Sequence, residues 1–146
     1  MKKWALEADM WAIEVCAMAT AGTAALAFPV LTGQAIRGHH AAFAPFIMDV
    51  VEGVQPSSLG LLLLVAFIGG LAGRSSPFLL GCASAAVLPL WSAIDMAMGG
   101  GGHNLLPFEW LAYAFYMALG TIGSAVGRGA RIRFRAKRAH RRDDAD

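Results

Sequence analysis

The middle of this chain contains very little charge. Between Met10 and Gly127 only seven residues are aspartate, glutamate, lysine or arginine, whereas 57% of the whole sequence is hydrophobic and a further 17 residues are glycine. Ordinary soluble domains have about 25% charged residues, and only about half of their residues are apolar. This composition excludes a soluble globule and a disordered middle segment, and it predicts a small polytopic membrane protein.

Residue types that carry chemistry are also scarce. The two cysteines form no C-x-x-C pair, and no histidine lies in a predicted span, so neither a thiol redox centre nor a bis-histidine haem is expected. We therefore predict no enzyme activity, no cofactor and no metal site. The polar residues on the outer side do not have the spacing of metal ligands. They are therefore interpreted as solvent-exposed loop residues in preference to a divalent-ion site. These residues are His39, His40, Asp49, Glu52, Asp95, His103 and Glu109.

Four segments are apolar and long enough to cross a bilayer, which requires about 20 residues. Proline in the first turn of the second, third and fourth segments costs no helical hydrogen bond. Pro29 and Pro89 lie inside spans, where they predict kinks. The expected fold is all-α, with a four-helix membrane domain over 1–127 and a basic tail over 128–146. The four predicted spans are 12–31, 56–73, 77–98 and 107–126.

The distribution of lysine and arginine sets the orientation. With four spans, eleven of the twelve basic residues lie on one side and only Arg37 lies on the other. We therefore expect an inner-membrane protein with both termini in the cytoplasm. In the outer loop, apolar residues from Phe43 to Val54 recur at helical spacing, which predicts a short interfacial helix.

Two helical hairpins share a sequence frame. Residues 68–74 read I-G-G-L-A-G-R and residues 122–128 read I-G-S-A-V-G-R, and a weaker match relates Cys16 to Cys82. Duplication and chance in a small residue alphabet both remain open. Both frames contain G-x-x-x-G, which lets another helix approach closely. The predicted packing glycines are Gly69, Gly73, Gly123 and Gly127.

Arginines follow the last span at helical spacing, so a helix that continued past the membrane would carry them as one stripe. Their two interpretations are a topology anchor, which is favoured, and binding to anionic lipid headgroups. Nucleic acid is not expected as a partner, because the tail lacks aromatic platforms. Together with the inner-loop arginine these residues are Arg74, Arg128, Arg131, Arg135, Arg138 and Arg142.

Ionisable residues inside spans are costly and are functional candidates. Glu14, Asp95 and Glu109 are the candidates for an ion or proton site. Glu14 lies close to the inner boundary, where a salt bridge with Arg74 or Arg128 is the favoured interpretation.

The expected function is thus a non-enzymatic accessory or packing component that acts through helix contacts. A homo-oligomeric small transporter or channel that uses an intramembrane carboxylate is the alternative. The expected partners are the lipid bilayer and a homo-oligomer or larger membrane complex.

Overall fold

The computed structural model describes residues 2–32, 56–97 and 106–143. The described residues form five helices and the turns between them, so the expected all-helical fold is confirmed. The predicted outer helix, the histidines at 39, 40 and 103, Asp49 and Glu52 lie outside the described residues. The helices are α1 (Lys2–Leu31), α3 (Pro56–Ala72), α4 (Pro77–Ala85), α5 (Val87–Ala97) and α6 (Leu106–Asp143).

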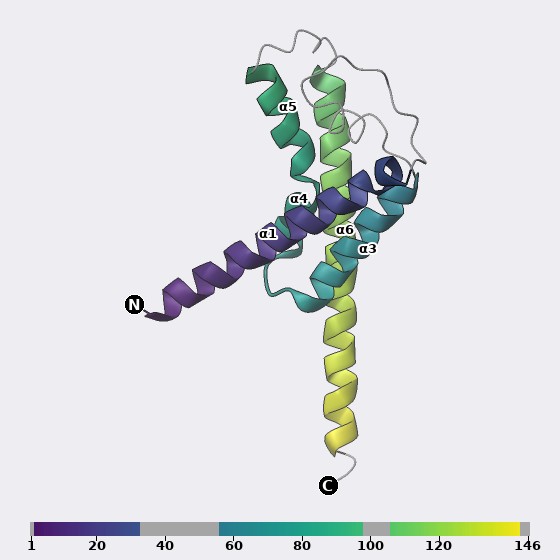
Figure 1. The fold of residues 1–146 in the computed structure, drawn as a ribbon. Helices are drawn as coiled ribbons and strands as arrows, with labels where there is room; N and C mark the ends of the chain where they lie inside the picture. The colour runs from purple at the N-terminus through teal and green to yellow at the C-terminus, as the bar shows by residue number, and fades with distance from the viewer. Residues whose placement is uncertain (1, 33–55, 98–105, 144–146) are drawn as a thin grey trace.

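The helices pack in layers around the middle of α6. Helix α1 lies across α3 and α4, and these two helices in turn pack against α6 (Figure 1). Helix α5 continues from α4 alongside the first part of α6. Past this packed region, the last turns of α6 project alone from the bundle (Figure 1).

Within residues 2–32, 56–97 and 106–143, two helical segments are long and apolar enough to cross a membrane, Asp9–Pro29 and Trp110–Arg138. The bent pair α4 and α5 makes a third if it is one span. The described chain is therefore compatible with a membrane-spanning protein. Helix α3 is apolar but has only 17 residues, which is the lower limit of the working range for a span. The expected layout of four spans is not confirmed by these lengths.

The third predicted span is broken at Ala86. Helices α4 and α5 meet there at 46°, and the N–H of Ala86 donates to the Ala83 carbonyl at 3.2 Å instead of continuing the α-helical pattern. Pro89 explains the position of the break, because its ring has no N–H to donate and collides with the carbonyl four residues earlier, that of Ala85. The kink predicted for this span is confirmed. Helix α1, in contrast, passes through Pro29 as one element.

Small residues and leucines make up the core. One buried cluster joins Leu26 of α1 to Leu62, Leu88 and Tyr113, and a second joins Met18 to Ala66, Leu80 and Ala83. Large apolar side chains on the outer face of α6 are in contrast exposed, as expected where lipid covers a helix. They include Leu111, Phe115, Ile122 and Val126.

Candidate functional site

Glu14 binds the turn between α3 and α4. This α3–α4 turn comprises residues 73–76, and it is close enough to α1 for both carboxylate oxygens to accept hydrogen bonds from it. The N–H of Arg74 donates to Oε1 at 2.9 Å and to Oε2 at 3.1 Å. The N–H of Ser75 donates to Oε2 at 2.9 Å, and its hydroxyl donates at 2.5 Å. The donors of these four bonds are main-chain amides and a hydroxyl, whereas the sequence had suggested a guanidinium partner.

The same turn is bound from the opposite side by α6. The guanidinium of Arg131 donates from Nη1 to the Gly73 carbonyl, at the end of α3. A cation is favoured at a helix C-terminus, and a carboxylate is favoured just before a helix N-terminus. Glu14 lies just before the start of α4, where Ser76 is the N-cap and accepts from the Leu79 N–H at 3.2 Å. We call Glu14, the α3–α4 turn and Arg131 the turn clasp, because it ties α1, α3, α4 and α6 at one end of the bundle.

Removing the contact of Arg131 with the Gly73 carbonyl should destabilise the fold. Arg131→Gln removes the charged donor at the Gly73 carbonyl and should lower the free energy of unfolding by about 1 kcal/mol. Arg135→Gln is the matched control, because Arg135 is exposed one turn further along α6. Reversible unfolding of both variants in mixed micelles measures the difference. Equal stability of the two variants would contradict the assignment of Arg131 to the clasp.

Glycines form the closest helix crossings. A Cβ atom at Gly22 would lie 1.8 Å from the Ser84 carbonyl oxygen, and one at Gly70 would lie 2.1 Å from the Ser124 carbonyl oxygen. At Gly81 the nearest atom would be the Thr121 backbone nitrogen, at 2.3 Å. The backbones therefore touch where α1 crosses α4 and where α6 crosses α3 and α4. The sequence frames did not single out these three glycines.

The glycines that the frames did predict have different neighbours. Gly123 and Gly127 face α3, and a Cβ at Gly127 would lie 2.1 Å from the Phe67 carbonyl oxygen. Gly69 faces the Met18 side chain of α1, and Gly73 lies at the clasp, where a Cβ would be 3.5 Å from Glu14 Oε2. The two predicted glycine pairs therefore do not face each other. An approach of α3 to α6 as close as that at Gly127 lies at the next position of the frame, where a Cβ at Gly70 would be 2.1 Å from the Ser124 carbonyl oxygen.

The other candidate residues are not brought to Glu14. Asp95 lies in α5 and Glu109 in the first turn of α6, whereas Glu14 lies beside the turn at the other end of α4. Among the described residues, no group of three or more histidine, cysteine or acidic side chains could hold a metal ion. Cys16 and Cys82 are free thiols.

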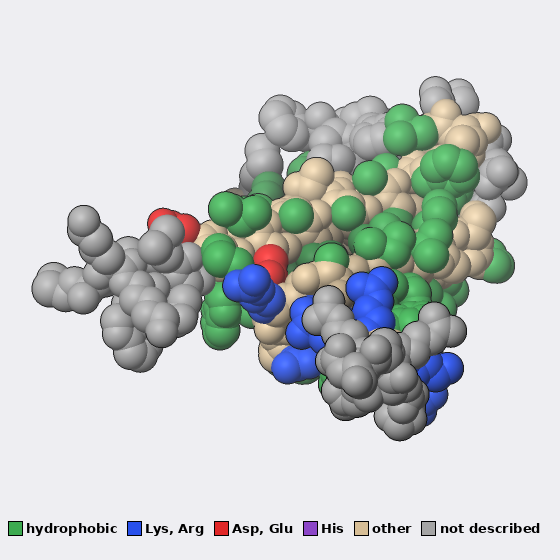
Figure 2. All heavy atoms as spheres, turned by 90° about the horizontal axis from the view of Figure 1, so that it is seen from below, with side chains coloured by type: hydrophobic (Ala, Val, Ile, Leu, Met, Phe, Trp, Pro, Cys, Tyr) green, Lys and Arg blue, Asp and Glu red, His purple; other side chains and the backbone are tan. Residues whose placement is uncertain are grey.

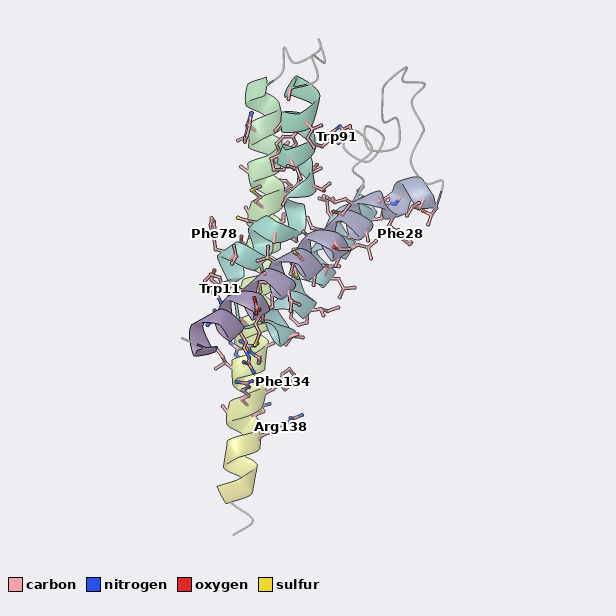
Figure 3. All side chains as sticks on the ribbon, turned by 60° about the vertical axis from the view of Figure 1, so that its left-hand side comes forward. Trp11, Phe28, Phe78, Trp91, Phe134 and Arg138 are labelled. Carbon is pink, nitrogen blue, oxygen red and sulfur yellow. The ribbon has the colours of Figure 1, made fainter. Side chains whose placement is uncertain are left out.

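Basic side chains gather on the face of the molecule that carries the clasp. Figure 2 shows lysine and arginine side chains around the projecting end of α6, with acidic atoms beside one of them. Helix α6 continues without a break to Asp143, so the arginines predicted to form a helical stripe do lie on a helix. In Figure 3, Phe134 and Arg138 lie on this projecting part, beyond the bundle. Both side chains are exposed.

The described part of the chain is all-helical, and two or three of its helical segments are suited to a membrane. Comparison of the chain with models of protein families, with curated proteins and with solved structures gives no match.

Proposed function

We propose that this chain is a non-enzymatic accessory or packing component of the inner membrane that acts through helix–helix contacts. The observation that carries the proposal is the set of hydrogen bonds that the Glu14 carboxylate accepts. The only candidate carboxylate whose side chain is described accepts four hydrogen bonds within the turn clasp, so it supports the fold instead of facing a path for ions. This bonding disfavours the alternative, a homo-oligomeric transporter or channel that uses that carboxylate.

We further propose four spans with both termini in the cytoplasm. Helices α1, α3 and α6 and the bent pair α4–α5 would be the spans, and the clasp would lie at the inner surface beside the basic end of α6. The positive-inside distribution supports this orientation.

Contact between Gly70 and Ser124 supports the proposal that the hairpins are duplicated, since these residues hold equivalent positions of the repeated frame. Equivalent residues meet at the axis when two copies are related by a two-fold rotation.

One face of α6 is suited to a partner helix. Val126, Gly129, Ala130, Arg133, Phe134 and Lys137 line a groove along it, at the three- and four-residue spacing of a single helix face. A Cβ atom at Gly129 would have no neighbour within 4 Å among the described residues. Because Gly129 and Ala130 are small, a second backbone can approach closely at this point.

Gly129→Leu tests the proposal. We expect the wild-type chain, tagged and gently extracted from native membranes, to elute with a stoichiometric larger membrane partner. The Gly129→Leu variant should fold normally and lose most of that partner, because the leucine side chain fills the groove. Gly60→Leu is the matched control, since Gly60 is equally open but lies on α3.

The outcomes separate the two functions. Native mass spectrometry gives the mass and composition of the extracted complex. A complex of this chain alone, together with ion flux in liposomes that Glu14→Gln abolishes, would favour the transporter and overturn the accessory proposal. Partner retention by the Gly129→Leu variant would exclude the groove as the contact.

A further inference from the structure

The α3–α4 turn and the part of α6 that contacts it carry three arginines. Arg74 follows Gly73 directly, and the Arg131 guanidinium binds the Gly73 carbonyl, so both residues border the α3–α4 turn. Arg128 precedes Arg131 by three residues on α6, which places the two on one helix face. We call Arg74, Arg128 and Arg131 the arginine cluster. Arg74 is exposed and the other two are half-buried.

The charge of this cluster is not balanced by its acidic neighbour. Glu14 is the carboxylate bound at the turn, and it already accepts four hydrogen bonds from Arg74 and Ser75 donors. Three guanidinium groups and one carboxylate leave an excess of positive charge, and Figure 2 shows basic side chains gathered around the projecting end of α6. A phosphate group suits such a place, because guanidinium groups bind phosphate oxygens through paired N–H donors.

The depth of the cluster indicates the source of that phosphate. Trp110, a residue type favoured at membrane interfaces, stands near the start of α6. Arg128 lies 18 positions after Trp110, which corresponds to about 27 Å of helix and is close to the thickness of the hydrocarbon layer. If α6 crosses the bilayer, the cluster lies at the level of the headgroups. Arg138 lies about 15 Å further along the helix axis, beyond the headgroup layer.

We propose that the arginine cluster is a binding site for the headgroup phosphate of an anionic phospholipid in the cytoplasmic leaflet. The guanidinium groups of Arg74 and Arg128 supply N–H donors, and Arg131 is held at the end of α3 and adds positive charge. A lipid bound here lies against both α3 and α6 at the clasp. The site needs no protein partner, and its place in the cytoplasmic leaflet rests on the orientation proposed above.

Native mass spectrometry with defined lipids tests this site. The purified chain in detergent is titrated with phosphatidylglycerol and, separately, with phosphatidylcholine. We expect one phosphatidylglycerol molecule to bind at least about tenfold more tightly than phosphatidylcholine, since each basic residue near a membrane surface contributes about 1 kcal/mol. The double variant Arg74→Gln/Arg128→Gln should lose about thirtyfold of this affinity, and Arg74→Lys/Arg128→Lys should keep most of it.

A control of equal charge makes the result specific. Arg135→Gln/Arg138→Gln removes the same charge from the exposed end of α6, and we expect it to leave the affinity unchanged. Equal losses in the two glutamine variants would indicate diffuse attraction and would overturn the site. Competition by millimolar inorganic phosphate would identify free phosphate as the ligand and would overturn the lipid assignment. Absence of a preference for phosphatidylglycerol in the wild-type chain would also contradict it.

Discussion

A single methyl group at position 22 should force α1 and α4 apart. The Cβ atom of a Gly22→Ala variant would lie 1.8 Å from the Ser84 carbonyl oxygen and 2.6 Å from its carbonyl carbon. Both atoms are backbone, so no side-chain rotation relieves the overlap and the helices must separate. We expect the free energy of unfolding to fall by about 3 kcal/mol, the upper end of the usual cost of overpacking.

Gly60→Ala is the control for this prediction. Nothing lies within 4 Å of a Cβ at Gly60 among the described residues, and alanine is the better helix former by about 1 kcal/mol. The two substitutions add the same methyl group and should have opposite signs. Thermal or denaturant unfolding in the same micelles compares them, with Gly70→Ala as a second variant at the crossing of α3 and α6. If alanine at positions 22 and 70 lowers the free energy of unfolding no more than alanine at position 60 does, the helices do not cross as closely as described.

Glu14→Gln should weaken the turn clasp strongly. The carboxylate has two oxygens that accept, whereas the amide has one oxygen and an NH₂ group that would face the N–H donors of Arg74 and Ser75. Hydrogen bonds to charged groups contribute about 1.5–3 kcal/mol each in water-soluble proteins, and interhelical bonds in membranes contribute less. We expect a total loss of about 2 kcal/mol in unfolding free energy.

Two comparisons identify the cause of that loss. Asp9→Asn removes the same charge from an exposed position of α1 and should have little effect. Ser75→Ala removes only the hydroxyl donor at 2.5 Å, and a double-mutant cycle with Glu14→Gln should give a coupling energy of about 1 kcal/mol. Strict additivity of the two substitutions would contradict a direct bond between these side chains.

The sequence predicted the helices better than their contacts. The proline at position 56 and the Ser76–Pro77 pair place the starts of α3 and α4 correctly, because capping and proline geometry are local. The kink of the third span followed from Pro89 for the same reason. Spans could not be counted from hydropathy alone, since helix α3 lies at the length limit and a bend of 46° separates α4 from α5.

The partners of the site residues depended on tertiary packing. Hydropathy placed Glu14 near a boundary and suggested a cationic partner, but only the packing of α1 against the turn brings the Arg74 and Ser75 amides to its carboxylate. The G-x-x-x-G frame likewise identified glycine-rich faces, but which glycine meets which backbone depends on how the helices cross. Ser124 shows this most clearly, because its hydroxyl donates to the Ala66 carbonyl at 3.1 Å at the crossing beside Gly70.

The state of Glu14 in a lipid bilayer tests the central claim most directly, because that claim assigns the carboxylate to the fold. Solid-state NMR on protein with ¹³C in the Glu14 carboxyl group and ¹⁵N in serine measures the dipolar coupling to the Ser75 amide. The hydrogen bond of 2.9 Å between Ser75 N and Glu14 Oε2 predicts a measurable coupling between the carboxyl carbon and the amide nitrogen. A carboxyl signal without that coupling, which instead exchanges magnetisation with mobile water, would contradict the clasp and favour an ion or proton path.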